Sequence, residues 1–167
     1  MFEPTSNYHT SIAGEFAALS QLALKGYDAN LTVGRAKSVD ILVSVPTTGK
    51  MYRLEVKTNW RSSRSAGGSS KLFGKYVSAW IMSEKHETIS DPLLFYCFVN
   101  ISPDAKTFRF VVVPSAIVSE YVKAQHQLWL KADEDHSREN KMRTFRIGTC
   151  CEHWENNWEF GCEGQSA

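Results

Sequence analysis

Two neighbouring stretches of alternating apolar residues constrain the fold of this chain more than any other feature. Val or Ile occupies every second position in residues 39–45, and Tyr, Leu and Val alternate in the same way within residues 51–58. Successive residues of a strand point to opposite faces, so each stretch predicts a β-strand with one buried face. The sequence Pro-Thr-Thr-Gly at 46–49 is typical of a turn, which joins the two strands into a hairpin.

Further helices and strands are predicted on both sides of this hairpin. A period of 3.6 residues predicts a first helix that starts at residue 10 or 11 and ends before Gly26, and a second helix over 114–131. The residues expected to face the core are Ile12, Phe16, Leu19, Leu22 and Ala23 in the first helix and Ile117, Tyr121, Ala124 and Leu128 in the second. Strands are predicted at 27–33, 93–101, 107–113 and 145–147. Residues 76–83 suit either a strand or a short helix, and 132–141 are expected to form a charged linker.

The order of these elements predicts an α/β fold in which a central mixed sheet is flanked by helices. With 167 residues, the chain has the length of one domain. We expect a leader at 1–9, the folded domain at 10–148, and an extension rich in Trp and Glu at 149–167. For the tryptophans of this extension, core packing or a closing lid is favoured over stacking on bases or a dimer contact.

Cysteine content and hydropathy favour a cytoplasmic protein. Four cysteines are too few for a disulfide scaffold, and no apolar run approaches the roughly 18 residues of a membrane helix. Cys97 is expected in the core, while His126 and His136 are expected on the surface. A zinc site near the C-terminus is disfavoured because adjacent cysteines fit a tetrahedral site poorly. Its ligands would be Cys150, Cys151, His153 and Cys162.

Positive charge is concentrated in one segment. Residues 34–75 hold nine basic residues and two acidic ones, although the net charge of the whole chain is only +1. Between 57 and 75 there are five basic residues and no acidic one, spaced by Ser, Gly and Asn. This pattern predicts a mobile loop that follows a phosphate backbone, and the alternative is a solvated surface loop. The residues expected to contact nucleic acid are Arg61, Arg64, Lys71 and Lys75.

Three carboxylates form the candidate site. If the hairpin turns between residues 47 and 48, Asp40 lies directly opposite Glu55 on the same face. Two facing carboxylates are destabilising unless they share a proton or a cation, and a divalent metal would resolve the conflict. Glu15 lies at the margin of the apolar stripe of the first helix, from which it can join the same cation.

Oxygen donors of this kind suit Mg²⁺, and Lys57 would act beside it. Magnesium would polarise a phosphate and activate water, while the lysine would orient the nucleophile or balance the developing negative charge. Acid-x-Lys triplets occur three times in the chain, and only the triplet at 55–57 lies within an apolar strand. The plainer alternative is an exposed hairpin face on which Lys57 and Arg53 relieve the repulsion.

The motifs resemble those of the PD-(D/E)XK nuclease superfamily. In that superfamily a helix Glu precedes a strand Asp, and Glu-x-Lys or Gln-x-Lys follows on the next strand. The matching segments are Gly14-Glu15-Phe16, Lys25-Gly26-Tyr27, Val39-Asp40-Ile41-Leu42-Val43 and Tyr52-Arg53-Leu54-Glu55-Val56-Lys57-Thr58. The pattern looks most like the branch of Holliday-junction resolvases and PD-(D/E)XK homing endonucleases. It covers residues 8–60, has Val39 in place of the proline of the motif, and matches nothing after Arg61.

The resemblance implies a restriction-endonuclease-like core and metal-dependent cleavage of nucleic acid. Carried over by position, Asp40, Glu55 and the Val56 carbonyl would be metal ligands, Glu15 the helix carboxylate, and Lys57 the catalytic lysine. Magnesium would be the cofactor, with Mn²⁺ as a substitute, and the family frequently forms homodimers. The leading hypothesis is therefore an endonuclease that acts on DNA. One alternative is a non-catalytic module that binds nucleic acid or a partner protein on the same fold, and another is a structural protein without affinity for nucleic acid.

Overall fold

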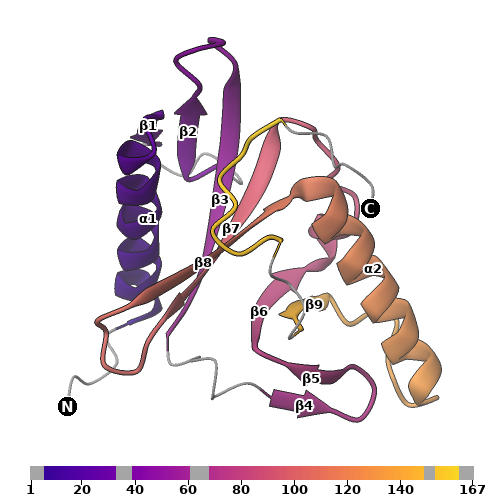
Figure 1. Cartoon of the computed structure of the whole chain (residues 1–167). Helices are drawn as coiled ribbons and strands as arrows, with labels where there is room; N and C mark the ends of the chain where they lie inside the picture. The colour runs from indigo at the N-terminus through magenta and orange to yellow at the C-terminus, as the bar shows by residue number, and fades with distance from the viewer. Residues whose placement is uncertain (1–5, 33–38, 61–67, 149–152, 162–167) are drawn as a thin grey trace.

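The computed structural model describes residues 6–32, 39–60, 68–148 and 153–161. Its centre is a five-stranded sheet with the strand order β1-β2-β3-β7-β8 (Figure 1). The strands are β1 (Asp28–Leu31), β2 (Ile41–Ser44), β3 (Met51–Trp60), β7 (Leu94–Ile101) and β8 (Phe108–Pro114). Strands β3 and β7 are parallel and the other neighbours antiparallel. The sheet is therefore mixed and flanked by helices, and the predicted fold class is confirmed.

Helix α1 (Asn7–Leu24) packs on one face of this sheet. Its buried residues Ala18 and Leu22 contact a core formed by β2, β3, β7 and β8. Trp158 and Phe160, from the described part of the C-terminal segment, pack in the same core. The Trp158 side chain is 3% exposed, which confirms the expected core packing for this tryptophan.

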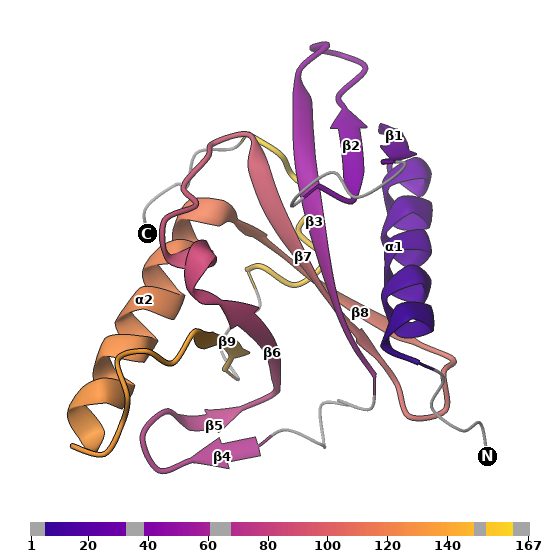
Figure 2. The ribbon, with the colours of Figure 1, turned by 180° about the vertical axis from the view of Figure 1, so that it is seen from behind.

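The opposite face is covered by a second layer (Figure 2). This layer consists of α2 (Ser115–Ala132) and a two-stranded sheet of β6 (Ser78–Ser83) and β9 (Met142–Ile147). A short 3₁₀ helix, η2 (Glu84–Glu87), follows β6. The hairpin formed by β4 (Gly68–Ser70) and β5 (Gly74–Tyr76) precedes it. Neither α-helix in the described ranges has the combination of length and apolar character needed to cross a membrane.

Strand β7 is buried along its whole length because it has a hydrophobic core on each face. Phe95, Cys97 and Val99 face α1, whereas the alternate residues Tyr96 and Phe98 face α2 and β6. The Phe98 ring stacks on Phe145 of β9 with centroids 4.3 Å apart. The predicted second hairpin and the core position of Cys97 are both confirmed.

The predicted first hairpin has the expected register. Ile41 lies opposite Leu54 and Ser44 opposite Met51, which is the pairing of a turn centred between residues 47 and 48. Strand β2 is shorter than the predicted 39–45, and β3 continues beyond the predicted end to Trp60. As a result, the second half of β3 extends past β2, and this overhang creates the open strand edge on which the candidate site lies.

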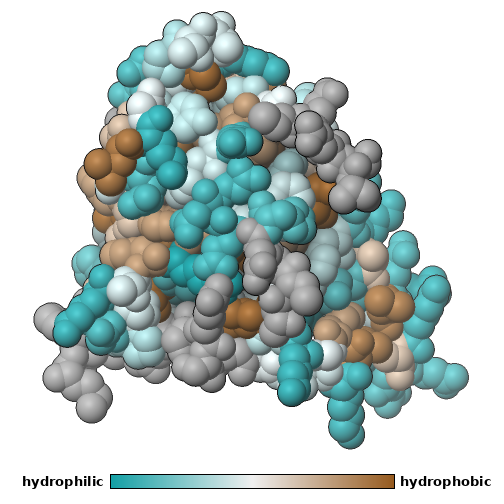
Figure 3. All heavy atoms as spheres, in the orientation of Figure 1, coloured by the Kyte–Doolittle hydropathy of each residue, from teal (hydrophilic) through white to brown (hydrophobic). Residues whose placement is uncertain are grey.

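The predicted helix faces are partly wrong. Helix α1 begins at Asn7 and not at residue 10, so part of the expected leader is helical. Its buried side is Gly14, Ala18 and Leu22, whereas Phe16 is 56% exposed. The buried side of α2 is formed by Ser115, Val118, Ser119 and Val122, while the predicted core residues Ile117, Ala124 and Leu128 are exposed. Figure 3 shows the resulting apolar surface over α1 and the lower part of α2.

The ambiguous and loop-like segments also differ from expectation. Residues 76–83, which suited a strand or a helix, contain strand β6. The predicted mobile basic loop at 57–75 is wrong for 57–60, which belong to β3, and for 68–75, which lie in the β4–β5 hairpin. The side chain of Arg146 holds the hairpin against β9, since its guanidinium carbon lies 4.5 Å from the Phe73 ring centroid and 5.8 Å from that of Tyr76. Residues 61–67 lie outside the described ranges.

Gly14 allows α1 to approach β3 closely, and we expect Gly14→Ala to destabilise the protein. A Cβ atom at this position would lie 1.8 Å from Thr58 Oγ1. Relief of this overlap costs about 1–3 kcal/mol, more than the ~1 kcal/mol that alanine gains over glycine within a helix. Urea unfolding measures the difference, with Ser20→Ala on the exposed side of α1 as the matched control. A more stable Gly14→Ala protein would contradict this packing.

Candidate functional site

Asp40 is held at the open edge of β3, at the point where β2 begins. Its backbone N–H donates to the Leu54 carbonyl at 2.9 Å, and its carbonyl accepts from the Thr32 N–H at 2.9 Å. Its carboxylate Oδ2 accepts the N–H of Val56 at 2.7 Å. On the β2 side of β3, the Asp40 carboxylate therefore takes the place of the strand carbonyl that would otherwise accept the Val56 N–H. The N–H and C=O of one strand residue point to the same side, so the Val56 carbonyl also faces this edge.

The predicted direct pairing of Asp40 with Glu55 is wrong. Asp40 lies just before β2, and its carboxylate turns to the Val56 amide instead of standing opposite Glu55. Burial raises the pKa of Asp40 above its usual range, and the charge of Glu55 raises it further. The Val56 N–H and the Lys57 ammonium oppose this rise. The two carboxylates thus interact electrostatically without forming a cross-strand pair.

Glu55 is a buried charge, with 3% of its surface exposed. Its Oε1 accepts from the Lys57 ammonium and lies 3.6 Å from Nε2 of His86. Burial alone would raise the pKa of Glu55, but the His86 ring and the Lys57 charge outweigh it and lower the pKa to about 2. Tyr96, opposite Glu55 on β7, faces the same side of the sheet. Burial first, and then the Glu55 carboxylate, raise the pKa of Tyr96.

Lys57 is the common neighbour of the three candidate carboxylates. It contacts Glu55 directly, and its charge lowers the pKa values of Asp40 and Glu15 against the effect of burial. Burial is the main cause that raises the pKa of Glu15, and the charge of Asp40 adds to it. The half-buried Glu15 is on α1, on the face of the sheet opposite to the buried Glu55. The three carboxylates therefore each interact with the Lys57 charge near the edge of β3, without lying on one face of the sheet.

A cleft of about 360 Å³ lies beside this edge. It runs from the start of α1 across the second half of β3 to β6, and Lys57 is part of its wall. The lining residues are Ser11, Val56, Lys57, Thr58, Asn59, Ala79, Trp80 and Ile81. At the floor of the cleft, the Asn59 side-chain amide donates to the Ala79 carbonyl at 3.0 Å, which ties β3 to β6. An extended segment of a ligand has room to lie along β3 next to Lys57.

The oxygen donors of the site have the chemistry that Mg²⁺ requires, but they are not gathered around one point. Within residues 6–32, 39–60, 68–148 and 153–161, no three His, Cys, Asp or Glu side chains are arranged to hold a metal ion. The Glu55 Oε1 is engaged by Lys57, whereas Oε2 is buried and has no hydrogen-bond partner. An unpaired carboxylate oxygen is a ready ligand, and Asp40 and Glu15 are carboxylates whose charge is poorly compensated.

The predicted nucleic-acid contacts divide into two groups. Lys71 lies in the turn of the β4–β5 hairpin and Lys75 on β5, and both are exposed. Arg61 and Arg64 lie outside the described residues, as do Cys150, Cys151 and Cys162 of the disfavoured zinc site. Of the two histidines expected on the surface, His136 stacks on Trp129 with ring centroids 3.8 Å apart and bonds to the Trp129 carbonyl.

His86 is the site residue that the sequence analysis missed. It lies 29 residues after Lys57 in a Glu-Lys-His-Glu segment that has the composition of an exposed turn. The η2 helix nevertheless buries it to 3% exposure next to Glu55. No local pattern predicts this, because the contact depends on how the chain between β3 and β7 folds back over the sheet. The sequence feature that could have drawn attention to His86 is a lone histidine among charged residues.

The pKa of Glu55 predicts a stability change in acid. Because the folded value of about 2 lies below the ordinary 4.5, ionised Glu55 stabilises the fold above pH 4.5, and this stabilisation is lost as the pH falls to 2. The linked free energy is about 3 kcal/mol. We expect the stability difference between wild type and Glu55→Gln to shrink by this amount between pH 5 and 2 in urea unfolding. Glu15 is common to both proteins, whereas Asp40 loses the Glu55 charge in the variant, which opposes a small part of this change. A difference that is constant with pH would contradict the assignment.

The sequence matches no protein-family model and no curated protein. Among solved structures, the chain is similar to the bacterial homing endonuclease I-Ssp6803I, with a TM-score of 0.49 and 10% sequence identity. The alignment covers 98% of this chain and 85% of that protein. The resemblance to PD-(D/E)XK nucleases in residues 8–60 stays a prediction.

Proposed function

We propose that the protein is a metal-dependent endonuclease that hydrolyses phosphodiester bonds in DNA. The observation that supports this most is the position of Lys57, whose ammonium interacts with Glu15, Asp40 and Glu55 at the edge of a cleft. One ammonium cannot balance three carboxylates, of which Glu55 is buried and Glu15 and Asp40 are half-buried. Burial in the first place, and the neighbouring carboxylates in the second, raise the pKa values of Glu15 and Asp40, so the site favours a further cation.

The residues proposed to hold Mg²⁺ are Asp40, Glu55, Glu15 and the carbonyl of Val56. All are oxygen donors, which suits Mg²⁺ or Mn²⁺ and disfavours softer metals. The bound ion would polarise the scissile phosphate and lower the pKa of a water molecule. Its charge would also offset the burial, and the smaller repulsion between carboxylates, that raise the pKa values of Asp40 and Glu15.

Lys57 has the role of orienting the nucleophile or stabilising negative charge on the phosphate. It lies in the wall of the cleft, so its ammonium can reach a backbone that runs along β3. Its ammonium is bonded to Glu55, and exchange of that bond for a phosphate oxygen would keep the ammonium paired. Asp40 fixes the edge of β3 by accepting the Val56 N–H, so the site does not depend on the metal for its backbone geometry.

The direct test is incubation of the purified protein with supercoiled, linear and branched DNA in the presence of Mg²⁺ or Mn²⁺. Wild type should cleave at least one substrate, and Asp40→Asn should not. The asparagine oxygen can still accept the Val56 N–H, so this variant removes the charge and keeps the hydrogen bond. Lack of cleavage by wild type, or undiminished cleavage by Asp40→Asn, would refute the proposal.

A second candidate is a non-catalytic nucleic-acid-binding or protein-interaction module. The observation in its favour is that the Glu55 Oε1 is already paired with the Lys57 ammonium and faces His86 without a metal. This candidate predicts that the protein binds DNA with the same affinity with and without Mg²⁺ and leaves the DNA intact.

The hairpin lysines provide a prediction for either candidate. We expect Lys71→Ala/Lys75→Ala to weaken DNA binding and to reduce the slope of log K against log salt by roughly 1.8, since each phosphate contact contributes about 0.9. Fluorescence anisotropy over a range of salt concentrations measures the slope. Lys50→Ala is the matched control, because this exposed lysine lies in the β2–β3 turn, at the end of the molecule remote from the hairpin in Figure 1. An unchanged slope in the double variant would exclude the hairpin from the interface.

A further inference from the structure

His86 is buried beside Glu55 and has one ring nitrogen without a hydrogen-bond partner. The ring belongs to η2, and its Nε2 lies 3.6 Å from the Glu55 Oε1. Nε2 is buried and makes no hydrogen bond, and the same holds for the Glu55 Oε2 and the Tyr96 hydroxyl. Three buried polar atoms without partners around one carboxylate are unusual, because buried polar groups in proteins are nearly always paired. The buried polar groups on this side of β3 therefore gather at the Glu55 carboxylate.

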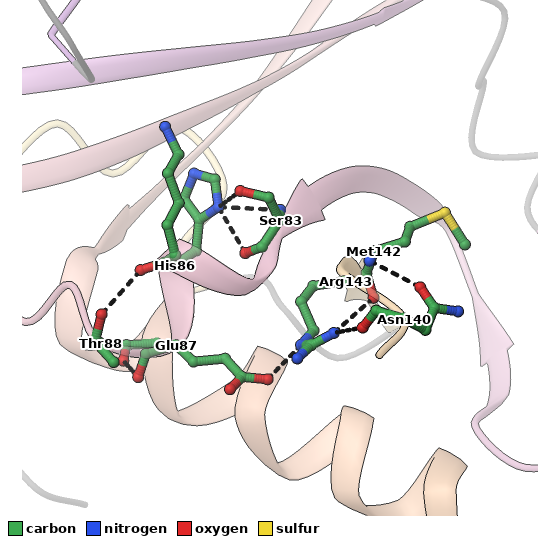
Figure 4. A network of polar contacts seen from close by, with 9 residues as sticks. Ser83, His86, Glu87, Thr88, Asn140, Met142 and Arg143 are labelled. Atoms are coloured by element: carbon green, nitrogen blue, oxygen red, sulfur yellow. Dashed lines mark hydrogen bonds and ion pairs between the residues drawn. The ribbon is translucent and has the colours of Figure 1, made fainter. Parts of the chain in front are cut away.

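The other nitrogen of His86 is fixed by Ser83 (Figure 4). The Ser83 N–H donates to Nδ1 at 3.1 Å, the Ser83 hydroxyl lies 3.2 Å away, and the Ser83 carbonyl lies 2.9 Å away. Nδ1 can accept the Ser83 N–H or donate to the Ser83 carbonyl, so these contacts fix the ring without selecting its tautomer. The group that calls for a proton on Nε2 is the Glu55 carboxylate, which faces this nitrogen. The end of β6 therefore sets the orientation of the ring.

The η2 helix is in turn held by the second layer of the protein. Glu87 forms an ion pair with Arg143 of β9, and its carbonyl accepts the Ser119 hydroxyl of α2 at 2.7 Å. Arg143 also donates to the Asn140 carbonyl at 2.6 Å (Figure 4). These contacts place His86 independently of β3, so the position of the ring does not rely on the carboxylate that it faces.

We propose that His86 is a positioning residue for Glu55. Its Nε2, 3.6 Å from Oε1, attracts this oxygen electrostatically and keeps it beside Lys57, which leaves the buried, unpaired Oε2 for a cation. Tyr96, opposite Glu55 on β7, lies on the same side of the sheet. This inference deepens the proposed function, since it assigns how Glu55 is oriented for a cation; the contact between His86 and Glu55 can be tested without cation or DNA.

The first experiment uses the metal-free protein. In ¹⁵N-labelled protein, two-bond ¹H–¹⁵N spectra should show His86 with its proton on Nε2, in slow exchange with solvent, and Glu55→Ala should abolish the slow exchange. A His86 ring that carries its proton on Nδ1 alone, or an Nε2 proton whose exchange is the same in Glu55→Ala, would overturn the proposal. This result does not depend on nuclease activity, so it separates a failure of the inference from a failure of the proposed function.

The second experiment compares His86→Leu with His86→Gln. Glutamine can place an N–H donor near the position of Nε2, whereas leucine fills the space without a donor. We expect Mg²⁺ affinity, measured by calorimetry without DNA, to fall by about 10–100-fold in His86→Leu and to be largely restored in His86→Gln. In DNA cleavage, the leucine variant should lower kcat with little change in KM for DNA. Circular dichroism and thermal melting establish that both variants fold.

The control for this series is His126→Leu on α2, which removes a histidine that stacks on Trp129 and does not contact Glu55. It should bind Mg²⁺ like wild type. Equal Mg²⁺ affinity in His86→Leu and wild type would overturn the positioning role, as would a glutamine variant as weak as the leucine variant. If wild type itself bound no Mg²⁺ and cleaved no DNA, the proposed function would fail, and the spectroscopic result would still decide whether His86 holds Glu55.

Discussion

Replacement of Lys57 by methionine is expected to reduce the rate of DNA cleavage by about 10²–10³-fold. Methionine keeps an unbranched apolar chain in the wall of the cleft and removes only the ammonium group. The variant thereby loses the positive charge that interacts with Glu15, Asp40 and Glu55. Single-turnover cleavage at saturating enzyme measures the effect on the chemical step, separate from DNA binding.

Two further variants sharpen this result. Lys50→Met removes a lysine from the same hairpin at its turn end, where the ammonium lies 5.3 Å from the Tyr52 ring centroid, and should leave the rate unchanged. Lys57→Arg keeps the charge but replaces a compact ammonium by a planar guanidinium, and should recover only part of the activity. Cleavage by Lys57→Met at the wild-type rate would contradict a catalytic role for Lys57. The lysine would then serve only as a structural partner of Glu55.

Truncation of Phe98 should produce the largest loss of stability among single substitutions in β7. We expect Phe98→Ala to cost about 3–5 kcal/mol in the free energy of unfolding. The ring is fully buried, stacks on Phe145 at 4.3 Å and packs against Trp80 at 5.0 Å. Its removal leaves a cavity between the central sheet and the β6–β9 layer, which rigid strands on both sides cannot close. Equilibrium unfolding in urea gives the value.

The control is Phe108→Ala in β8, because this phenylalanine is 39% exposed and stacks only against the edge of the core at Phe110. It should cost less than about 1 kcal/mol, in the range of surface substitutions. Similar losses for Phe98 and Phe108 would mean that the layer of β6, β9 and α2 contributes little packing energy. The comparison therefore tests the second layer, whose arrangement the sequence did not predict.

The first hairpin was predictable because its sequence pattern is compatible with one strand register. The strand period of two fixes which residues of β2 and β3 are buried, and the turn at 46–49 fixes which residues lie opposite each other. The same logic located Asp40, Glu55 and Lys57. It failed in one detail, because β2 begins only after Asp40, and the Asp40 carboxylate bonds to the Val56 N–H instead of facing Glu55.

The helix faces were harder to predict, because close packing selected small residues over large apolar ones. Gly14 and Ala18 let α1 lie near β3, and the larger Phe16 remains on the surface. In α2, Ser119 is buried because its hydroxyl bonds to the Glu87 carbonyl. Hydrophobicity alone cannot identify the buried side of either helix, since that side is decided by how closely the helix approaches the sheet or strand beneath it. The same dependence on tertiary packing concealed His86.

Because β7 is buried on both faces, the reactivity of Cys97 in this strand depends on how often the core opens. Cys97 lies in the middle of this strand with none of its surface exposed, and burial raises the pKa of its thiol. Ionisation of the thiol is therefore disfavoured in the native state, and a thiol-modifying reagent reaches the sulfur only after the layer that contains α1 moves away from this face of β7. The rate of Cys97 labelling, followed by mass spectrometry of the peptide that contains it, consequently measures how often the middle of the molecule comes apart.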